Sequence, residues 1–220
     1  MNYEKDTKNA YRNEFKARQY QEQYIRGAKW ARFTMWRQKR LIEKIIETCS
    51  FKKTETILDI PCGTGFIGRI LCRSAASVVA SDISNEMMKR AFEEYGGSNF
   101  KGFVQSDITQ IPFRMGSFDC VIILAFMHRL PKEIRNKAWE EAVSLSRRLI
   151  VVNYSLDSCL QKIKQWLIKK VYSRHIPAPS NLPLEDILSE IESYGLIVRK
   201  MYHIVPFLSA KILFLLEKKI

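Results

Sequence analysis

The stretch that decides the fold is DIPCGTGFIG, residues 59–68, where two different nucleotide-binding loops overlap. From Gly63 onward the letters spell G-x-G-x-x-G, the dinucleotide-binding fingerprint. From Asp59 onward they spell an acid followed shortly by a glycine-rich turn. Both patterns meet one physical need, a turn without side chains at which the backbone can approach a cofactor closely. The residues around the loop therefore have to distinguish the two patterns.

Strands and helices alternate on both sides of this loop. Apolar runs predict seven strands, and amphipathic spacing predicts the helices between them. Alternation of this kind predicts an α/β fold with a doubly wound, mostly parallel sheet. The last two strands are joined by only five residues, which permits only an antiparallel last strand. The predicted strands cover residues 55–60, 77–83, 99–108, 118–127, 147–155, 196–205 and 211–218, and the predicted helices cover 66–76, 85–96, 131–146 and 182–195.

Two additions flank this α/β core. Residues 1–53 predict a helical extension, and residues 155–180 predict a basic helical insertion within the main domain, residues 54–220. The extension carries 14 Lys and Arg against six Asp and Glu, the insertion five against one, and residues 54–154 are nearly balanced at 12 against 11. The net charge of +13 therefore sits on the additions, where it suggests an anionic substrate, a membrane surface or a nucleic acid.

Composition excludes several other classes of protein. The chain has 220 residues, 46% of them apolar, which is enough for one substantial core. It has no uninterrupted apolar run of 18 residues and a polar N-terminus, so we expect a cytoplasmic protein, with peripheral membrane contact as an alternative. Its five cysteines are scattered and form no C-x-x-C pair, so we expect neither a disulfide framework nor a metal site.

Asp82, 19 residues after Gly63, serves either loop pattern by holding ribose hydroxyls. Three other features separate the two patterns. Asp59 and Pro61, however, interrupt the direct passage from an apolar strand into the glycines that a nicotinamide fingerprint normally has. A second acid, Asp107, ends the third predicted strand, where it can accept an adenine amino group. Finally, the residues after the fourth strand contain no second α/β domain for a reductase substrate.

With these residues in place, the chain resembles the class I S-adenosylmethionine-dependent methyltransferases from about residue 55 to the C-terminus. The motifs that carry the resemblance are ILDIPCGTG, VVASDIS with MM just beyond, QSDITQIPFRMGSFDCVI and the closing antiparallel strand. The resemblance implies S-adenosylmethionine as cofactor and S-adenosylhomocysteine as product. It also implies that Asp59 orients the loop or the cofactor's ammonium group. The cofactor-binding residues predicted from the motifs are Asp59, Pro61, Cys62, Gly63, Gly65, Asp82, Ile83, Met87, Asp107, Ile108, Leu124 and Ala125.

Several of these residues also have simpler interpretations. The family usually has glycine where Pro61 stands, so this loop is stiffer and lacks one N–H donor. Asp82 and Asp107 can also be turn formers or helix caps, and Cys62 a loop filler. His128 follows the fourth strand, at the edge where doubly wound sheets place their chemistry, and is the candidate catalytic base. The alternative is a histidine that only shapes the pocket.

Absent motifs narrow the methyl acceptor. In this superfamily an N-P-P-Y or D-P-P-Y sequence after the fourth strand marks methylation of amide or nucleobase amino groups, and none occurs here. The segment LAFMHRL, residues 124–130, also holds no acid to bind magnesium, which argues against metal-assisted methylation of catechol-like acceptors. An oxygen acceptor, or less directly nitrogen or carbon, on a small or amphiphilic molecule remains. Apolar residues at helical spacing among lysines in residues 157–174 favour an anionic lipid or glycolipid acceptor and peripheral membrane contact, although an ordinary surface helix has the same pattern.

The N-terminal extension leaves further alternatives open. Its aromatic and basic stretch YIRGAKWARFTMWRQKR, residues 24–40, also suits an RNA methyltransferase. A second alternative is a non-catalytic partner protein that only binds S-adenosylmethionine. We expect the extension to act as a lid over cofactor and substrate, with Tyr20, Arg32 and Arg37 on its inner face, or else to pack on the sheet only for stability.

Overall fold

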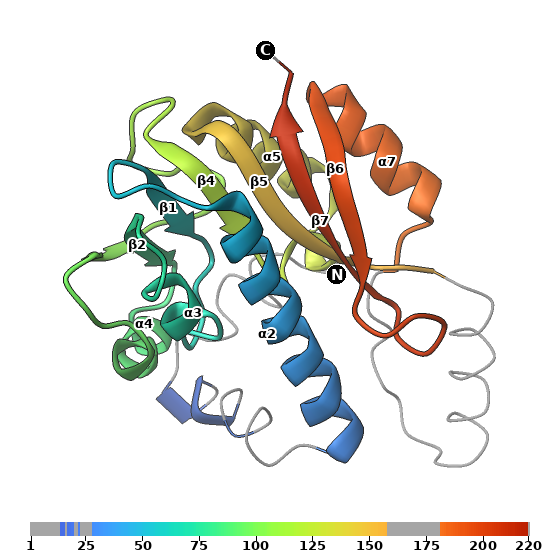
Figure 1. Cartoon of the computed structure of the whole chain (residues 1–220). Helices are drawn as coiled ribbons and strands as arrows, with labels where there is room; N and C mark the ends of the chain where they lie inside the picture. Colours follow the sequence, from blue (N-terminus) through green and yellow to red (C-terminus); the bar gives the residue numbers. More distant parts are fainter. Residues whose placement is uncertain (1–13, 16, 20–21, 23–27, 158–180, 220) are drawn as a thin grey trace.

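The structure is a computed structural model of the 220-residue chain, and it describes residues 14–15, 17–19, 22, 28–157 and 181–219. A single mixed sheet runs through the molecule with helices on both faces (Figure 1). The elements are α2 (Lys29–Cys49), β1 (Thr56–Asp59), α3 (Gly68–Leu71), β2 (Ser77–Asp82), α4 (Asn85–Ala91), η2 (Phe92–Glu94), β3 (Phe100–Gln105), β4 (Phe118–Ile123), η3 (Met127–Arg129), α5 (Lys132–Leu145), β5 (Ser146–Ser155), α7 (Leu184–Ser193), β6 (Leu196–His203) and β7 (Lys211–Lys218).

The sheet confirms the predicted fold class. Its seven strands lie in the order β3-β2-β1-β4-β5-β7-β6. The strands from β1 to β5 pair in parallel, whereas β7 runs antiparallel to both β5 and β6. The order in which strands are added changes side at β1, because β2 and β3 lie on one side of β1 and the next strand, β4, lies on the other. Such a switch point is where doubly wound sheets bind their ligands, outside the carboxyl ends of the strands.

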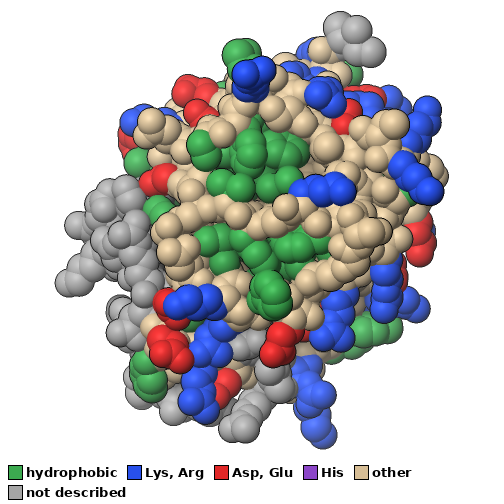
Figure 2. Space-filling view, turned by 90° about the vertical axis from the view of Figure 1, so that its left-hand side faces the viewer, with side chains coloured by type: hydrophobic (Ala, Val, Ile, Leu, Met, Phe, Trp, Pro, Cys, Tyr) green, Lys and Arg blue, Asp and Glu red, His purple; other side chains and the backbone are tan. Residues whose placement is uncertain are grey.

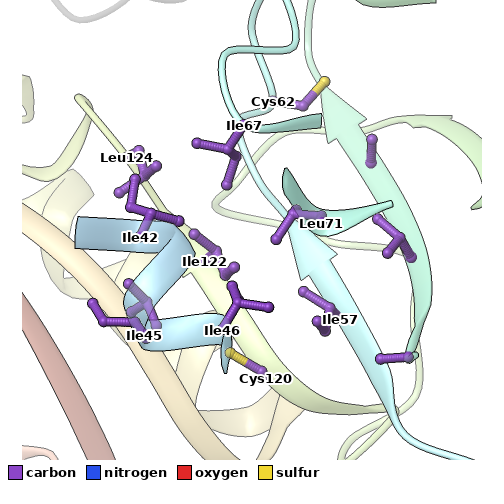
Figure 3. Packing of buried hydrophobic residues seen from close by; sticks show 14 of the residues in the cluster. Ile42, Ile45, Ile46, Ile57, Cys62, Ile67, Leu71, Cys120, Ile122 and Leu124 are labelled. Atoms are coloured by element: carbon purple, nitrogen blue, oxygen red, sulfur yellow. The ribbon is translucent and has the colours of Figure 1, made fainter. Parts of the chain in front are cut away.

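Apolar side chains on both faces of the central strands bury two cores. The core on one face includes side chains of α2 and α3, and the core on the opposite face includes side chains of α5 and α7. Figure 3 shows the first of these, where Ile42, Ile45 and Ile46 of α2 meet Ile57 of β1 and Ile122 of β4. Viewed from the β3 edge, hydrophobic side chains gather over the middle of the surface and Lys and Arg lie mostly around them (Figure 2).

Helix α2 lies within the N-terminal extension and packs on the sheet. Its buried residues, Thr34, Gln38, Ile42, Ile45 and Ile46, recur every three or four positions, which is the spacing of one helix face. Burying three isoleucines stabilises the helix by several kcal/mol, on the order of 2 kcal/mol each. The described part of α2 is therefore a structural component of the core.

Several predicted elements are shorter in the structure than the sequence suggests, among them the helix after the glycines and the fourth strand. The helix expected over residues 66–76 is confined to α3, because the carbonyls of Ser74 and Ala76 leave the helical ladder and accept from the side-chain amide of Asn99. The strand expected over 118–127 ends at Ile123, because Ala125 adopts φ +55°, outside the extended region. The second difference lies at the carboxyl edge of the sheet, where β4 ends.

A buried carboxylate joins the far-side helices to the sheet. Glu190 of α7 accepts from Arg135 Nε at 2.8 Å, from Trp139 Nε1 at 2.7 Å and from the Tyr154 hydroxyl at 2.7 Å. Four groups from α5, α7 and β5 thereby satisfy one another in the interior. Among the helices that the structure describes, none has the length and apolar character needed to cross a membrane.

Candidate functional site

The glycine-rich loop between β1 and α3 is fastened to the two neighbouring strands. Ile60 N–H donates to the carbonyl of Ile122 in β4 at 3.0 Å, and Cys62 N–H donates to the carbonyl of Ser81 in β2 at 2.8 Å. The loop thus continues the sheet by one step before it turns. Its position is fixed directly above the switch point between β1 and β4.

Asp82, at the end of β2, holds the turn of this loop. Its Oδ2 accepts from Gly63 N–H at 2.9 Å, and its Oδ1 accepts from Ser84 N–H at 2.8 Å. Burial raises the pKa of this carboxyl to about 6, although the backbone N–H groups of Ser84 and Gly63 oppose the rise. Each oxygen keeps a further lone pair, so the carboxylate can still accept from a ligand hydroxyl. Its predicted role toward a ribose stays a prediction.

Asp59, at the end of β1, is a second buried carboxylate beside the same loop. It is only 2% exposed, and its Oδ2 accepts from the hydroxyl of Tyr95. Burial raises its pKa to about 7, the Tyr95 hydrogen bond opposes this, and the negative charge of Asp82 adds to it. None of the described side chains that shift this pKa is cationic, so ionised Asp59 has no cationic partner among them. A cationic ligand group would favour its charged form.

A pocket opens between the glycine-rich loop, the end of β4 and α2. Its volume is about 60 Å³, well below the roughly 300 Å³ from which small-molecule sites begin. Six of the predicted cofactor residues line it, namely Asp59, Pro61, Cys62, Gly63, Leu124 and Ala125. The other lining residues were missed by sequence reasoning, and they are Met35, Gln38, Thr64, Phe66, Ile67 and Lys211.

The two glycines predicted to cradle the cofactor have different surroundings. Gly63 has φ +55°, and a Cβ added to it would meet nothing within 4 Å, so it leaves open space beside the pocket. Gly65 has φ +79°, and a Cβ there would lie 2.7 Å from Cβ of Glu94. Gly65 is therefore required by packing against the segment after α4. Only Gly63 presents bare backbone to a ligand.

The end of β4 forms the opposite wall. Ala125 has φ +55°, a conformation that costs a non-glycine residue on the order of 1 kcal/mol or more. Its N–H donates to Oδ1 of Asn153, a residue of β5 that is 1% exposed. Asn153 thus holds the β4 turn in place from the neighbouring strand. The signal for Asn153 in the sequence was only a polar residue inside an apolar strand.

The predicted adenine side lies beyond β2 and outside the pocket. Asp107 Oδ1 accepts from the N–H of Thr109 at 3.0 Å and from its hydroxyl at 2.9 Å, as expected of a turn former. Ile108 and Met87 are buried, and Ile83 is half-buried with its carbonyl accepting from Gln105 Nε2 at 3.0 Å. These residues line up along the β2 and β3 ends, where their contact with an adenine stays a prediction.

The inner face of the N-terminal helix differs from the one predicted. Tyr20 lies outside the described residues. Arg32 is exposed, Arg37 is half-buried, and neither lines the pocket. Met35 and Gln38 line it instead, because the buried stripe of α2 faces the loop. The ammonium of Lys39 lies 5.0 Å from the centre of the Phe66 ring and adds a cation–π contact between helix and loop.

His128 lies in η3, just beyond the β4 turn. It is 7% exposed, and its Nδ1 has no hydrogen-bond partner among the described residues. Burial, followed by the positive charges of Arg129 and Lys211, lowers its pKa to about 4. The imidazole is therefore neutral at pH 7. A base whose conjugate acid is so strong removes a proton from an alcohol only weakly, and its predicted catalytic role stays a prediction.

These features together define a class of fold. A 3-2-1-4-5-7-6 sheet with antiparallel β7, a glycine-rich loop after β1 and acids ending β1 and β2 is the class I, Rossmann-like methyltransferase architecture. Within the described part of the chain, no group of three His, Cys, Asp or Glu side chains is arranged to hold a metal ion.

Comparison with known proteins finds a family match in the core of the chain. Residues 57–148 match the family model described as a methyltransferase domain. Demethylmenaquinone methyltransferase of Clavibacter sepedonicus is 41% identical over 69 residues, 31% of this chain and 28% of that one. Malonyl-[acyl-carrier protein] O-methyltransferase of Legionella pneumophila is 30% identical over 95 residues, 41% of this chain and 34% of that one. The matched segments thus span about a third of these relatives.

Solved structures extend the likeness of fold to nearly the whole chain. Magnesium protoporphyrin IX methyltransferase from Synechocystis PCC 6803, solved with bound S-adenosylhomocysteine, superposes with a TM-score of 0.71. That alignment covers 87% of this chain and 88% of the other at 15% identity, so it concerns the fold alone. A TehB-like S-adenosylmethionine-dependent methyltransferase from Corynebacterium glutamicum gives a TM-score of 0.64 at 16% identity, over 94% of this chain and all of the other.

Proposed function

We propose that the protein is an S-adenosylmethionine-dependent methyltransferase. The observation that carries this proposal is the loop geometry, in which Asp82 fixes Gly63 while Asp59 and Gly63 both border one pocket. One structural neighbour, magnesium protoporphyrin IX methyltransferase, is described both with S-adenosylmethionine and with S-adenosylhomocysteine bound, which supports the same cofactor here. When bound, this cofactor supplies a methyl group on a positively charged sulfonium.

The residues at the site fit such a cofactor by charge and shape. The open space at Gly63 admits an amino-acid chain close to the backbone, and Asp59 offers a buried negative charge to its ammonium group. Asp82 retains acceptor capacity for ribose hydroxyls beside the same turn. The chain's contribution to catalysis is then to align the donor with the acceptor, which is the main requirement of an in-line displacement.

The lid hypothesis receives support from the small volume of the pocket. A cofactor of this size cannot enter about 60 Å³, and α2 contributes Met35 and Gln38 to the wall that confines it. We infer that α2 or the residues before it move when cofactor binds. Deleting residues 1–27 should then change the rates of cofactor binding and release, which stopped-flow fluorescence of the tryptophans can measure. Unchanged rates would contradict a lid.

Calorimetry with S-adenosylhomocysteine and NADH tests the proposed cofactor directly. We expect binding of the former and none of the latter. Asp82→Ala should weaken S-adenosylhomocysteine binding by roughly 1–3 kcal/mol, because it removes a charged acceptor and frees the Gly63 N–H. Binding of NADH alone would overturn the proposal, and methyl transfer to any extract fraction would exclude a non-catalytic binding protein.

For the acceptor, we propose O-methylation of a small, amphiphilic or lipid-like molecule that carries negative charge. In support, one relative bears the name of a demethylmenaquinone methyltransferase and another that of a malonyl-[acyl-carrier protein] O-methyltransferase, and a structural neighbour is named for magnesium protoporphyrin IX. The basic insertion over residues 155–180 is expected to contact such an acceptor or a membrane, and its residues 158–180 lie outside the described residues. Binding to anionic rather than neutral vesicles, reversed by salt, is the test.

An RNA acceptor is the second candidate, and the outer face of α2 favours it. Trp30, Phe33 and Trp36 are 40%, 42% and 53% exposed, and the rings of Phe33 and Trp36 stack at 6.0 Å. Exposed aromatic rings beside Arg32 and Arg40 provide stacking and phosphate contacts of the kind that RNA-binding surfaces use. Radiolabelled methyl donor incubated with separate RNA and lipid fractions decides between the two acceptors.

A further inference from the structure

Lys211 is a cationic side chain on the wall of the pocket beside the glycine-rich loop. It is the first residue of β7 and pairs with Ser155, the last residue of β5, so it stands at the carboxyl edge of the parallel strands. Its side chain lines the pocket together with Asp59, Gly63 and Ala125. The ammonium reaches this pocket from a strand that lies two places beyond β4 in the sheet.

This cation has no counterion in the part of the chain that the structure describes. No hydrogen bond or ion pair of its ammonium occurs there, and Asp59, on the same pocket, forms none with it. Burial lowers the pKa of Lys211, and the positive charge of Arg129 lowers it further. A half-buried lysine with a cationic neighbour is costly unless a ligand compensates for it.

The neighbouring groups point to an anion as that ligand. His128 is buried with an unpartnered Nδ1 and senses the charges of both Arg129 and Lys211, so the three basic side chains share one region. Arg129 and His128 belong to η3, which packs against β5. Lys211 and Arg129 carry positive charge in this region beyond the β4 turn, and the neutral His128 lies near them with an unpartnered nitrogen. Positive charge of this kind attracts an anion.

The position of this cluster assigns it to the acceptor side. The residues predicted for the nucleoside, Asp82 and Asp107, follow β2 and β3, on one side of the switch point. Lys211 lies on the other side, about three strand spacings or roughly 14 Å from β1 measured between strand axes. Only its long side chain reaches back to the pocket. It therefore lies where a second substrate approaches the donor's methyl group.

We propose that Lys211, with Arg129 and His128 beside it, binds a negatively charged oxygen of the methyl acceptor, so that the acceptor atom is a carboxylate or phenolate oxygen and not a neutral hydroxyl. This inference rests on the proposed methyltransferase function and specifies its acceptor. The anionic oxygen forms a bond to the methyl carbon while the carbon–sulfur bond breaks and its electron pair remains on sulfur. An ester or ether and a neutral thioether result, and no proton is transferred.

The absence of a proton transfer agrees with the state of His128. A neutral hydroxyl acceptor needs a base, and the only histidine beside the β4 turn in the described chain has its charged form disfavoured by burial and by two cations. An acceptor that arrives already ionised removes that need. His128 then donates a hydrogen bond from its unpartnered Nδ1–H to the bound anion.

Acetate and its neutral isostere acetamide are suitable probes, because both are small enough for the pocket. Their binding to the full-length protein can be followed by amide chemical shifts of Gly63 and Ala125, with and without saturating S-adenosylhomocysteine. We expect acetate to bind in both states and acetamide in neither. Lys211→Met should weaken acetate binding at least tenfold, and Lys211→Arg should weaken it less. The control Lys200→Met, which removes an exposed lysine from β6, should change acetate binding less than twofold.

Each other outcome overturns a defined part of the proposal. Equal binding of acetate and acetamide, or acetate binding unchanged in Lys211→Met, removes the anion site. The acceptor assignment is overturned if S-adenosylhomocysteine displaces acetate and Lys211→Met also loses tenfold in S-adenosylhomocysteine affinity. Lys211 would then bind the carboxylate of the cofactor itself. Failure of wild-type protein to bind S-adenosylhomocysteine refutes the proposed function instead, and acetate binding to the free protein still decides whether Lys211 is an anion site.

Discussion

Asp59→Asn distinguishes the loss of folding stability caused by the buried carboxylate from its contribution to ligand binding. The substitution keeps the shape of the side chain, and the amide oxygen can still accept from the Tyr95 hydroxyl, so mainly the charge is lost. Burial raises the pKa of Asp59 from 3.8 to about 7. This difference corresponds to roughly 4 kcal/mol, at about 1.4 kcal/mol for each pH unit, and is an upper bound because the nearby charge of Asp82 shares in it.

The sign of the effect follows from which state binds the proton more tightly. The folded protein holds the proton of Asp59 at higher pH than the unfolded chain does. Its contribution to stability is therefore fully present below pH 3.8 and is lost as the pH rises through about 7, and Asp82, raised to about 6, acts in the same direction. We expect Asp59→Asn to match wild type near pH 4 and to exceed its free energy of unfolding by roughly 1–3 kcal/mol at pH 8.

Binding should change in the opposite direction. An ammonium group beside Asp59 favours the ionised carboxylate, so S-adenosylhomocysteine should bind wild type more tightly at pH 8 than at pH 5.5 and displace a proton. Asp59→Asn should lose at least tenfold in affinity at pH 8 and show little pH dependence. Asp119→Asn is the matched control, since it removes an acid that accepts from Thr56 outside the pocket. Urea unfolding and calorimetry measure both quantities, and a loss of stability that is equal at both pH values would refute the reasoning.

Three further substitutions test the loop and the β4 turn. Gly63→Ala should cost only about 1–2 kcal/mol of stability for its positive φ, but weaken S-adenosylhomocysteine binding at least tenfold in calorimetry, because the added Cβ projects into open space. Gly65→Ala should lower the urea midpoint clearly more than Gly63→Ala does, because its Cβ would lie 2.7 Å from Cβ of Glu94; equal midpoints would contradict this packing role. Asn153→Ala should cost roughly 1–3 kcal/mol and speed hydrogen exchange of the Ala125 amide, which loses its acceptor.

The acids and glycines of the site could be predicted because the signal for each is local. Asp59 and Asp82 end the predicted strands that became β1 and β2, and parallel neighbours bring their carboxyl ends to one edge. Their spacing to Gly63 therefore suffices to place all three together, and the 2.9 Å bond between Asp82 and Gly63 agrees with that placement. The antiparallel pairing of β6 and β7 was equally predictable, because a short connection permits nothing else.

The remaining walls of the pocket could not be predicted in the same way. Helical periodicity indicates that one face of α2 is buried, but not which element covers it. The sequence therefore predicts Arg32 and Arg37 for the inner face, whereas Met35 and Gln38 line the pocket. Lys211 is the first residue of a strand whose place in the sheet is set by long-range pairing with β5. Its proximity to the loop depends on a side chain that spans neighbouring strands, and sequence patterns carry no signal for that.

The two charged groups at the pocket, Asp59 and Lys211, bear on the order in which the products of the proposed reaction leave. Asp59 and Lys211 border the same space without forming an ion pair with each other, and burial shifts the pKa of each toward its neutral form. Each is therefore stabilised by a ligand of opposite charge, a cation for Asp59 and an anion for Lys211. Under the proposed chemistry, transfer of the methyl group to an anionic oxygen neutralises both that oxygen and the sulfonium. The attraction of Lys211 for the acceptor is then lost at the moment of reaction, while that of Asp59 for the cofactor's ammonium persists. The methylated acceptor should consequently leave before S-adenosylhomocysteine, and product-inhibition kinetics, in which S-adenosylhomocysteine competes with the methyl donor and the methylated acceptor does not, would establish that order.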